Sequence, residues 1–346
     1  MMKMEAGQPP YFEWIKDNLP KGSTIGVDEG QIPAKSFEQR QKYFKDNGIN
    51  LVGISENLVD EVWADEKPAM PEEKVWVLED QFTGEHTLEK FKRISEKMDK
   101  KASMMLLTTL DDIAWVLNLR GNDIEFNPLF FSYLLLQKTD SGMKGHLFIK
   151  EDKVADVKDY LASINVAVSD YSGLEAAIKE LSNEENKHIS INKGQCSQRL
   201  VQVLNNFDFS VVEESGIVEL MKSKKNPVMQ EGMRQANIRD CAAIMKYFAF
   251  LEEELRKPDH TLDEFTGARK VEEYRTFGQY YKGPSFDSIS SIGPNGAVIH
   301  YKPSKEEALK LNNDEIYLLD SGGQYLDGTT DITRTAHFGG KAPTPF

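Results

Sequence analysis

A segment near the end of the chain, Leu319–Thr335, places two aspartates beside a reversal of the chain. Apolar residues lead into Asp320, a stretch rich in Gly and Asp follows, and Asp331 then opens a run that alternates in polarity. This pattern predicts two antiparallel strands joined by a turn. Carboxylates on neighbouring strands can hold a hard divalent cation between them. The segment therefore predicts a hairpin with Asp320 and Asp331 as candidate metal ligands.

The position of the turn decides whether the two carboxylates can share an ion. Asp320 and Asp331 lie directly opposite each other only if the reversal is centred between Tyr325 and Leu326. A two-residue turn at Asp327–Gly328, the usual hairpin signal, would leave Asp320 roughly 13 Å along the strand from the partner of Asp331. A metal site therefore requires a longer loop or a bulge. The alternative is an acidic hairpin with solvated carboxylates.

Composition excludes several classes of partner. The chain has 346 residues, of which 40% are hydrophobic and 28% charged, as in soluble proteins of two or three domains. A net charge of −14 without a dense Lys/Arg block argues against nucleic acid. No apolar run approaches the roughly 20 residues of a membrane span, and the first residues lack a signal-peptide core. Only Cys196 and Cys241 are cysteines, which indicates a reducing compartment. We expect a cytoplasmic protein without nucleic-acid or membrane partners.

Strand–helix–strand patterns recur in the first two-thirds of the chain and predict an α/β protein. Ser36 with Gln39, and Thr109 with Asp112, have the spacing of residues that cap helix N-termini. The acidic, Pro-containing stretch at 65–71 is a candidate linker. The expected strands are residues 23–27, 49–54, 104–107, 188–191 and 209–212, with helices after Ser36, after Thr109 and at 200–204.

The last third of the chain changes character after a basic run at 222–227. Apolar residues from Ile238 to Ala249 recur at helical spacing, and Thr261 with Glu264 predicts the start of a second helix. Strands at 288–292 and 297–301 are expected on either side of a turn at 294–296. His300 lies near the end of the second strand, and the pattern alone favours a structural histidine that hydrogen bonds to a neighbour. The expected domain ranges are 1–68, 69–226 and 227–346.

Several motifs together resemble one family, the Xaa-Pro aminopeptidases (aminopeptidase P) of the three-domain eukaryotic cytosolic type. These enzymes are a branch of the pita-bread metallopeptidases, family M24. The resemblance covers nearly the whole chain, and its most specific residues are Gly293–Tyr301, Leu319–Thr335, Leu117–Asp123 with Asn127–Tyr133, and Lys225–Asn226 with Glu231–Arg234.

The resemblance implies an α/β (α+β) fold, with two ribonuclease-H-like (creatinase N-terminal-like) domains followed by the start of a pita-bread catalytic domain. It implies an exopeptidase, a homodimer when full length, that releases the first residue of peptides with proline at the second position. Two divalent metals that share a hydroxide would perform the hydrolysis; manganese is expected, with zinc and cobalt as alternatives.

The resemblance also assigns roles to individual residues. Asp320 would chelate one metal, Asp331 would bridge both, and His300 would contact the substrate. Thr333 would hydrogen bond to a ligand carboxylate, and Arg334 would do the same or pair on the surface.

The family's other ligands, one histidine and two glutamates, would lie beyond Phe346, and Met1 corresponds to the middle of the family's first domain. The chain is therefore expected to be incomplete at both ends and inactive alone. Prolidase and methionine aminopeptidase are weaker fits, because of the Gly-Thr-Thr-Asp context and the two N-terminal domains. The alternative from another class is a non-catalytic pita-bread-like module that binds peptides or proteins.

Overall fold

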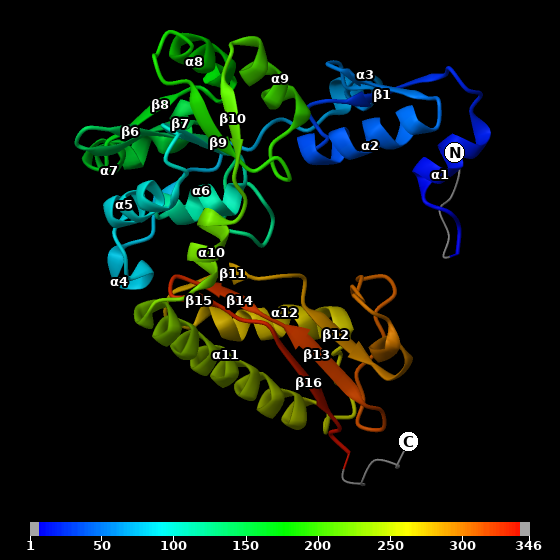
Figure 1. Cartoon of the computed structure of the whole chain (residues 1–346). Coiled ribbons are helices and arrows are strands. Elements are labelled where there is room, and N and C mark those ends of the chain that lie inside the picture. The colour runs from blue at the N-terminus through cyan, green and yellow to red at the C-terminus, as the bar shows by residue number, and fades with distance from the viewer. Residues whose placement is uncertain (1–6, 340–346) are drawn as a thin grey trace. The chain divides into compact units, whose positions relative to one another are not determined.

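The computed structural model describes residues 7–339, which form two compact units (Figure 1). The first unit takes its described residues from Met1–Trp76, Thr87–Leu119 and Phe130–Ser223. The second takes them from Val77–His86, Arg120–Leu129 and Lys224–Phe346. The chain passes between the units five times, after Trp76, His86, Leu119, Leu129 and Ser223. The short strands β3 (Trp76–Val77) and β5 (Leu119–Arg120) lie at two of these crossings.

The first unit begins with the expected strand–helix–strand motif. Strands β1 (Thr24–Asp28) and β2 (Asn50–Ile54) are parallel and are joined by helix α2 (Ala34–Asp46). Helices α1 (Tyr11–Asn18) and α3 (Leu58–Trp63) flank the motif, and η1 (Ala64–Glu66) is a short 3-10 turn. Buried Ile32, Phe37, Phe44, Ile49 and Leu51 form its core.

The predicted helix cap at Ser36 and Gln39 is wrong. Helix α2 begins three residues earlier, at Ala34, and its N-cap is Pro33, which makes no side-chain capping bond. The backbone amides of Ala34 and Lys35 instead donate to the carbonyl oxygens of Cys196 (2.9 Å) and Lys193 (3.0 Å). Because main-chain acceptors satisfy these two amides, the helix can begin without a capping side chain.

A six-stranded sheet forms the centre of the first unit, in the order β10-β9-β4-β6-β7-β8. β10, β9 and β4 are mutually parallel, β6 and β7 form an antiparallel hairpin next to β4, and β8 is parallel to β7. The strands are β4 (Met104–Leu107), β6 (Tyr133–Thr139), β7 (Gly142–Phe148), β8 (Val166–Ser169), β9 (His188–Ile191) and β10 (Ser210–Glu213). The strands expected at 104–107, 188–191 and 209–212 are thus confirmed.

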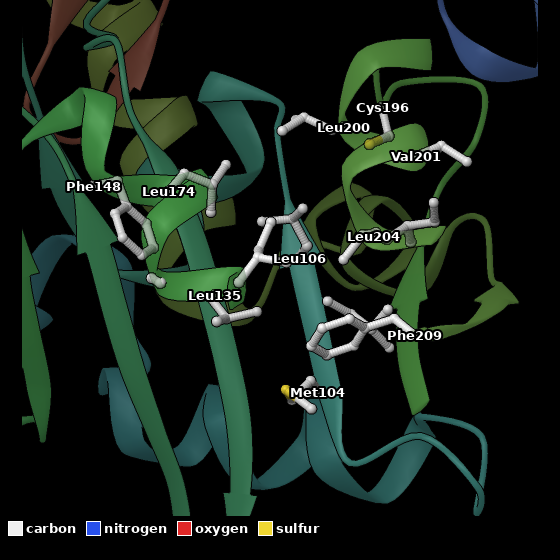
Figure 2. Close-up of a cluster of buried hydrophobic side chains, with 14 of the residues drawn as sticks. Met104, Leu106, Leu135, Phe148, Leu174, Cys196, Leu200, Val201, Leu204 and Phe209 are labelled. Carbon is white, nitrogen blue, oxygen red and sulfur yellow. The ribbon is translucent and has the colours of Figure 1, made fainter. Parts of the chain in front are cut away.

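Helices surround this sheet: α5 (Thr87–Lys97), α6 (Leu110–Val116), α7 (Lys158–Ser163), α8 (Leu174–Leu181), α9 (Gln198–Asn206) and α10 (Ile217–Ser223), with the 3-10 turns η2 (Glu151–Val157) and η3 (Tyr171–Gly173). Figure 2 shows buried side chains from strands and helices meeting in one cluster, among them Met104, Leu106 and Leu135 with Leu174 and Leu204. Such a cluster supplies the main stabilising term of an α/β layer.

Two helices and two small sheets form the second unit. The helices are α11 (Pro227–Glu254) and α12 (Glu264–Thr276), with the single turn α4 (Asp80–Thr83). One antiparallel sheet has the order β12 (Ile289–Ile292), β13 (Tyr317–Ser321), β16 (Ile332–Ala336). The other has the order β11 (Tyr281–Pro284), β14 (Gly323–Tyr325), β15 (Gly328–Thr329).

One face of the β12-β13-β16 sheet packs against helices α11 and α12. Its buried residues Ile292, Tyr317, Leu319 and Ile332 join a single core with helix residues that include Ile244, Tyr247, Leu251 and Val271. The opposite face, here called the open face, carries the alternate residues of each strand.

Two predictions in this unit are wrong. The cap of α12 is Asp263 with Thr266, not Thr261 with Glu264. The expected strand at 297–301 is absent: the chain forms the 3-10 turn η4 (Gly293–Ala297), and His300 adopts a left-handed φ of +57°. The cause is tertiary, since Glu264 is fully buried and binds side chains of this segment.

Among the described residues, no helix combines the length and the apolar character needed to span a bilayer.

Candidate metal centre

The hairpin that carries the two aspartates keeps a single register along its length. Asp320 pairs with Thr333 near the base, and Tyr325 pairs with Gly328 at the tip. The turn therefore consists of Leu326–Asp327, halfway between the two reversals considered from the sequence. The longer loop or bulge that a metal site was expected to require is absent between Tyr317 and Ala336.

This register makes the two aspartates diagonal neighbours. Continuing the pairing places Asp331 opposite Gly322, two residues from Asp320 and therefore about 7 Å along the strand. Diagonal neighbours on one face remain within reach of each other's side chains. The hairpin thus brings Asp320 and Asp331 to the same region of the open face without a direct pair.

Glycine is required where the hairpin passes between the two sheets. A Cβ at Gly322 would lie 2.0 Å from the carbonyl oxygen of Thr330 and 2.3 Å from Oγ of Ser285. Ser285 Oγ donates to that carbonyl at 2.7 Å, and the Thr330 hydroxyl accepts from the amide of Gly323 at 2.8 Å. These contacts fix the backbone immediately before Asp331.

The environment of Asp320 fits a cation ligand. Asp320 is partly buried, and its Oδ1 is buried without any hydrogen-bond partner. A buried oxygen without a donor costs free energy, and a bound cation would remove that cost. Asp331 is exposed. The pair therefore combines one shielded carboxylate with one that faces solvent. The carboxylate oxygens of both residues are ligands that hard divalent ions prefer.

The structure places Thr333 and Arg334 on different faces. Thr333 lies opposite Asp320, so both are on the open face. Arg334 pairs with Leu319, a core-facing residue, and its Nη1 donates to the carbonyl of Thr333 at 2.7 Å. Only Thr333 shares a face with the aspartates, and a hydrogen bond from either residue to a ligand carboxylate stays a prediction.

His300 is an exposed residue of the loop 293–309. A Cβ added at Gly296 in this loop would lie 3.8 Å from Oγ of Ser291 and 3.9 Å from Cβ of Leu318. These two side chains are on the open face, since Ser291 pairs with Leu318 two residues from Asp320. The start of the loop that carries His300 therefore lies against the face that bears the aspartates.

The loop then returns toward the end of β12 nearest Asp320. Lys302 forms an ion pair with Asp287, which is two residues before Ile289, the β12 partner of Asp320. His300 lies in the chain between these two anchors, Gly296 and Lys302. Both anchors bring its loop toward the aspartates.

A buried ion pair lies behind the strand of Asp320. Arg275 and Asp240 are both fully buried, with Nε–Oδ1 at 2.5 Å and Nη2–Oδ2 at 3.1 Å. Arg275 Nη2 also donates to Ser321 Oγ at 2.9 Å, and the Tyr325 hydroxyl donates to Asp240 Oδ1 at 2.9 Å. The network joins both helices to the residue that follows Asp320.

From the sequence, Asp240 and Arg275 were not singled out, and Glu264 was expected only to cap a helix. Each is a charged residue in the buried stripe of its helix, and that position was the available signal. The buried stripe of α11 includes Ala236, Asp240, Ala243, Ile244 and Tyr247, and that of α12 includes Glu264, Ala268, Val271 and Arg275.

Residues 1–346 alone are expected to bind Mn²⁺ more weakly than micromolar. Within residues 7–339 no group of three or more His, Cys, Asp or Glu side chains is arranged to hold a metal. Two carboxylates supply fewer ligands than divalent ions usually take in proteins, and their mutual repulsion opposes ionisation without the ion. Calorimetric titration with Mn²⁺ measures this. Micromolar or tighter binding that Asp331→Asn abolishes would contradict it.

Two family models match successive parts of the chain. Residues 66–229 match the Creatinase/Prolidase N-terminal domain, and residues 231–345 match Metallopeptidase family M24. A probable Xaa-Pro aminopeptidase P of Aspergillus fumigatus is 41% identical over 338 residues, which are 96% of this chain and 51% of that protein. One of Penicillium rubens is 41% identical over 347 residues, or 98% and 55%.

Solved structures agree with this assignment. A cytosolic X-prolyl aminopeptidase from Caenorhabditis elegans, described as having a di-nuclear active site, superimposes with a TM-score of 0.87 and 30% identity over 99% of this chain and 56% of that one. An Xaa-Pro dipeptidase from Bacillus anthracis, 17% identical with a TM-score of 0.57, shares the fold over 75% of this chain and 67% of its own.

The chain belongs to metallopeptidase family M24, a family of hydrolases, and carries the N-terminal domain of the creatinases and prolidases. Its relatives within that family are the Xaa-Pro aminopeptidases P. The predicted resemblance and fold class are thus confirmed. The chain spans about half the length of the curated relatives it matches. The boundaries expected at 68 and 226 stay predictions.

Proposed function

We propose that the protein to which this chain belongs is an Xaa-Pro aminopeptidase, which releases the first residue of peptides with proline at the second position. The observation that carries the proposal is the open face: it bears the buried Asp320 oxygen without a partner and the neighbouring Asp331, and the start of the His300 loop lies against it. The relatives, which are Xaa-Pro aminopeptidases, supply the substrate class.

We propose that Asp320 and Asp331 hold two divalent ions, Mn²⁺ by preference and Zn²⁺ or Co²⁺ as alternatives. Support comes from the all-oxygen donor set, which suits Mn²⁺, and from the di-nuclear site described for the worm relative. When bound, such ions supply Lewis acidity that polarises a peptide carbonyl and activates water.

The residues of this chain position the substrate around that chemistry. The His300 imidazole would donate a hydrogen bond or proton to the prolyl nitrogen as it leaves, a role that imidazole can fill near neutral pH. The Thr333 hydroxyl would donate to a ligand carboxylate and fix its orientation. The carboxylate of Asp331 is exposed to solvent, as a group that meets a peptide must be.

The proposal extends to the setting in which the enzyme works. We expect free peptides as substrates, a homodimer as the full-length form and the cytoplasm as its location, without nucleic-acid or membrane partners. The description of the worm relative as a cytosolic enzyme supports the location.

The complete protein with Mn²⁺ is expected to hydrolyse Xaa-Pro peptides and to leave matched Xaa-Ala peptides intact. Both peptides are assayed with wild type and with Asp320→Asn, which should lose metal and activity together. Equal turnover of the two peptides would refute the proline specificity. Peptide binding without hydrolysis, with no metal bound, would favour the non-catalytic binding module instead.

A further inference from the structure

We propose that Glu264 is a positioning residue for His300: its buried carboxylate anchors the loop 293–309 and thereby holds the imidazole over the open face. The inference deepens the proposed function and rests on it for the role of His300. The anchoring itself is independent of any activity.

Four groups donate hydrogen bonds to the Glu264 carboxylate, which is fully buried. The amide of Ile292 donates to Oε1 at 2.8 Å, and the amide of Leu309 donates to Oε2 at 2.9 Å. The Tyr301 hydroxyl donates to Oε2 at 2.7 Å, and Asn295 Nδ2 lies 3.0 Å and 3.2 Å from the two oxygens. One side chain therefore binds the start, the middle and the end of the loop.

A carboxylate suits this position better than any neutral side chain. It accepts at both oxygens and donates at neither, which matches a site where all four partners are donors. Glu264 is also the first residue of the 13-residue helix α12, where the helix dipole favours negative charge. Burial raises the pKa of Tyr301 to about 12, and its hydrogen bond to Glu264 adds to the effect, so this hydroxyl stays a donor at neutral pH.

The loop has little packing of its own around His300. Val298 is 53% exposed and Ile299 is 85% exposed. His300 itself has a φ of +57°, a conformation that costs energy for a residue other than glycine and persists only where its surroundings impose it. The anchored residues Asn295 and Tyr301 lie on either side of this strained position. Glu264 therefore holds the residues on both sides of the strained position, together with the ion pair of Lys302 and Asp287.

The test is Glu264→Gln in the complete, Mn²⁺-loaded protein, with Glu273→Gln as the matched control. The amide offers one acceptor oxygen and turns an NH₂ group toward the loop's donors, so the loop must shift. Glu273 is an exposed residue of the same helix, paired only with Lys270. We expect kcat to fall by about 10–100-fold, the usual effect of misplacing a catalytic group by about an ångström, with bound Mn²⁺ unchanged. The control should retain full kcat.

A double-mutant cycle separates positioning from general damage. If Glu264 acts through His300, Glu264→Gln lowers kcat in wild type but has little further effect in the His300→Ala background. Full additivity of the two losses would overturn the proposal. Tyr301→Phe, which deletes one donor and leaves the charge in place, should show the same non-additivity and serves if Glu264→Gln does not fold.

Hydrogen exchange provides a reading that needs no activity. The amides of Ile292 and Leu309 should exchange faster in Glu264→Gln than in Glu273→Gln, while β13 stays protected. If wild type hydrolyses no Xaa-Pro peptide, the proposed function fails, yet this measurement still decides whether Glu264 anchors the loop. Unchanged exchange at both amides would refute the anchoring.

Discussion

Replacement of His300 by alanine is expected to lower kcat of the complete protein by about 10²–10⁴-fold while its manganese content stays unchanged. The start of the loop 293–309 lies against the face that bears Asp320 and Asp331, and His300 is an exposed residue of this loop. A positioned proton donor acts in the transition state, so its loss should appear in kcat. Loss of a metal ligand would instead empty the site.

The measurement pairs the rate with bound manganese on the same preparation. His188→Ala is a suitable control, because His188 lies in strand β9 of the other unit and bonds to Asn186; it should leave kcat and metal unchanged. If His300→Ala loses metal, His300 is a ligand. If rate and metal both persist, His300 is a surface residue of the loop without a part in catalysis.

Much of the fold could be predicted because its signals are local. The run Met104–Leu107 is apolar throughout, as a strand at the centre of a sheet must be, and it forms β4 between β6 and β9. The Asn-Gly pair that follows α2 is another local signal: Gly48 has a φ of +77°, a conformation that glycine adopts without strain. The alternation after Asp331 likewise forms β16.

The register of the aspartate hairpin could not be predicted, because residues distant in sequence select its turn. Asp327 forms an ion pair with Arg239, and a Cβ at Gly232 would lie 2.3 Å from the carbonyl oxygen of Asp327. The Arg239 guanidinium also lies over the rings of Tyr280 and Tyr325, at 5.4 Å and 5.3 Å from their centroids. Helix α11 therefore overrides the local preference for a turn one residue later.

The false strand at 297–301 has a similar cause. Alternation and the Asn295–Gly296 turn signal favoured a strand, but no local pattern reports that Glu264 binds Asn295 and Tyr301. A buried acid within an apolar helical stripe indicates that something must donate to it. It does not say which segment.

Replacement of Arg275 by methionine should destabilise the second unit by about 3–5 kcal/mol. Asp240 would then be fully buried without its cation, and the bond to Ser321, the neighbour of Asp320, would be lost. Arg256→Met is the matched control, because Arg256 pairs with Glu252 on the surface and is 69% exposed. Its loss should cost less than about 1 kcal/mol.

The two units need not unfold together, so a global transition would mix their stabilities. All four tryptophans, Trp14, Trp63, Trp76 and Trp115, lie in the first unit, and their fluorescence would not report on Arg275. Hydrogen exchange of amides in α11 and β13 measures the second unit directly.

Adding Asp240→Asn to Arg275→Met tests the cause of the loss. The amide removes the buried charge but still accepts from the Tyr325 hydroxyl, so the double variant should recover part of the stability lost by Arg275→Met. A double variant that is less stable than Arg275→Met would show that packing of the long side chain, rather than the unpaired carboxylate, sets the cost. Recovery would identify the ion pair as the element that holds α11, α12 and the strand of Asp320 in one arrangement.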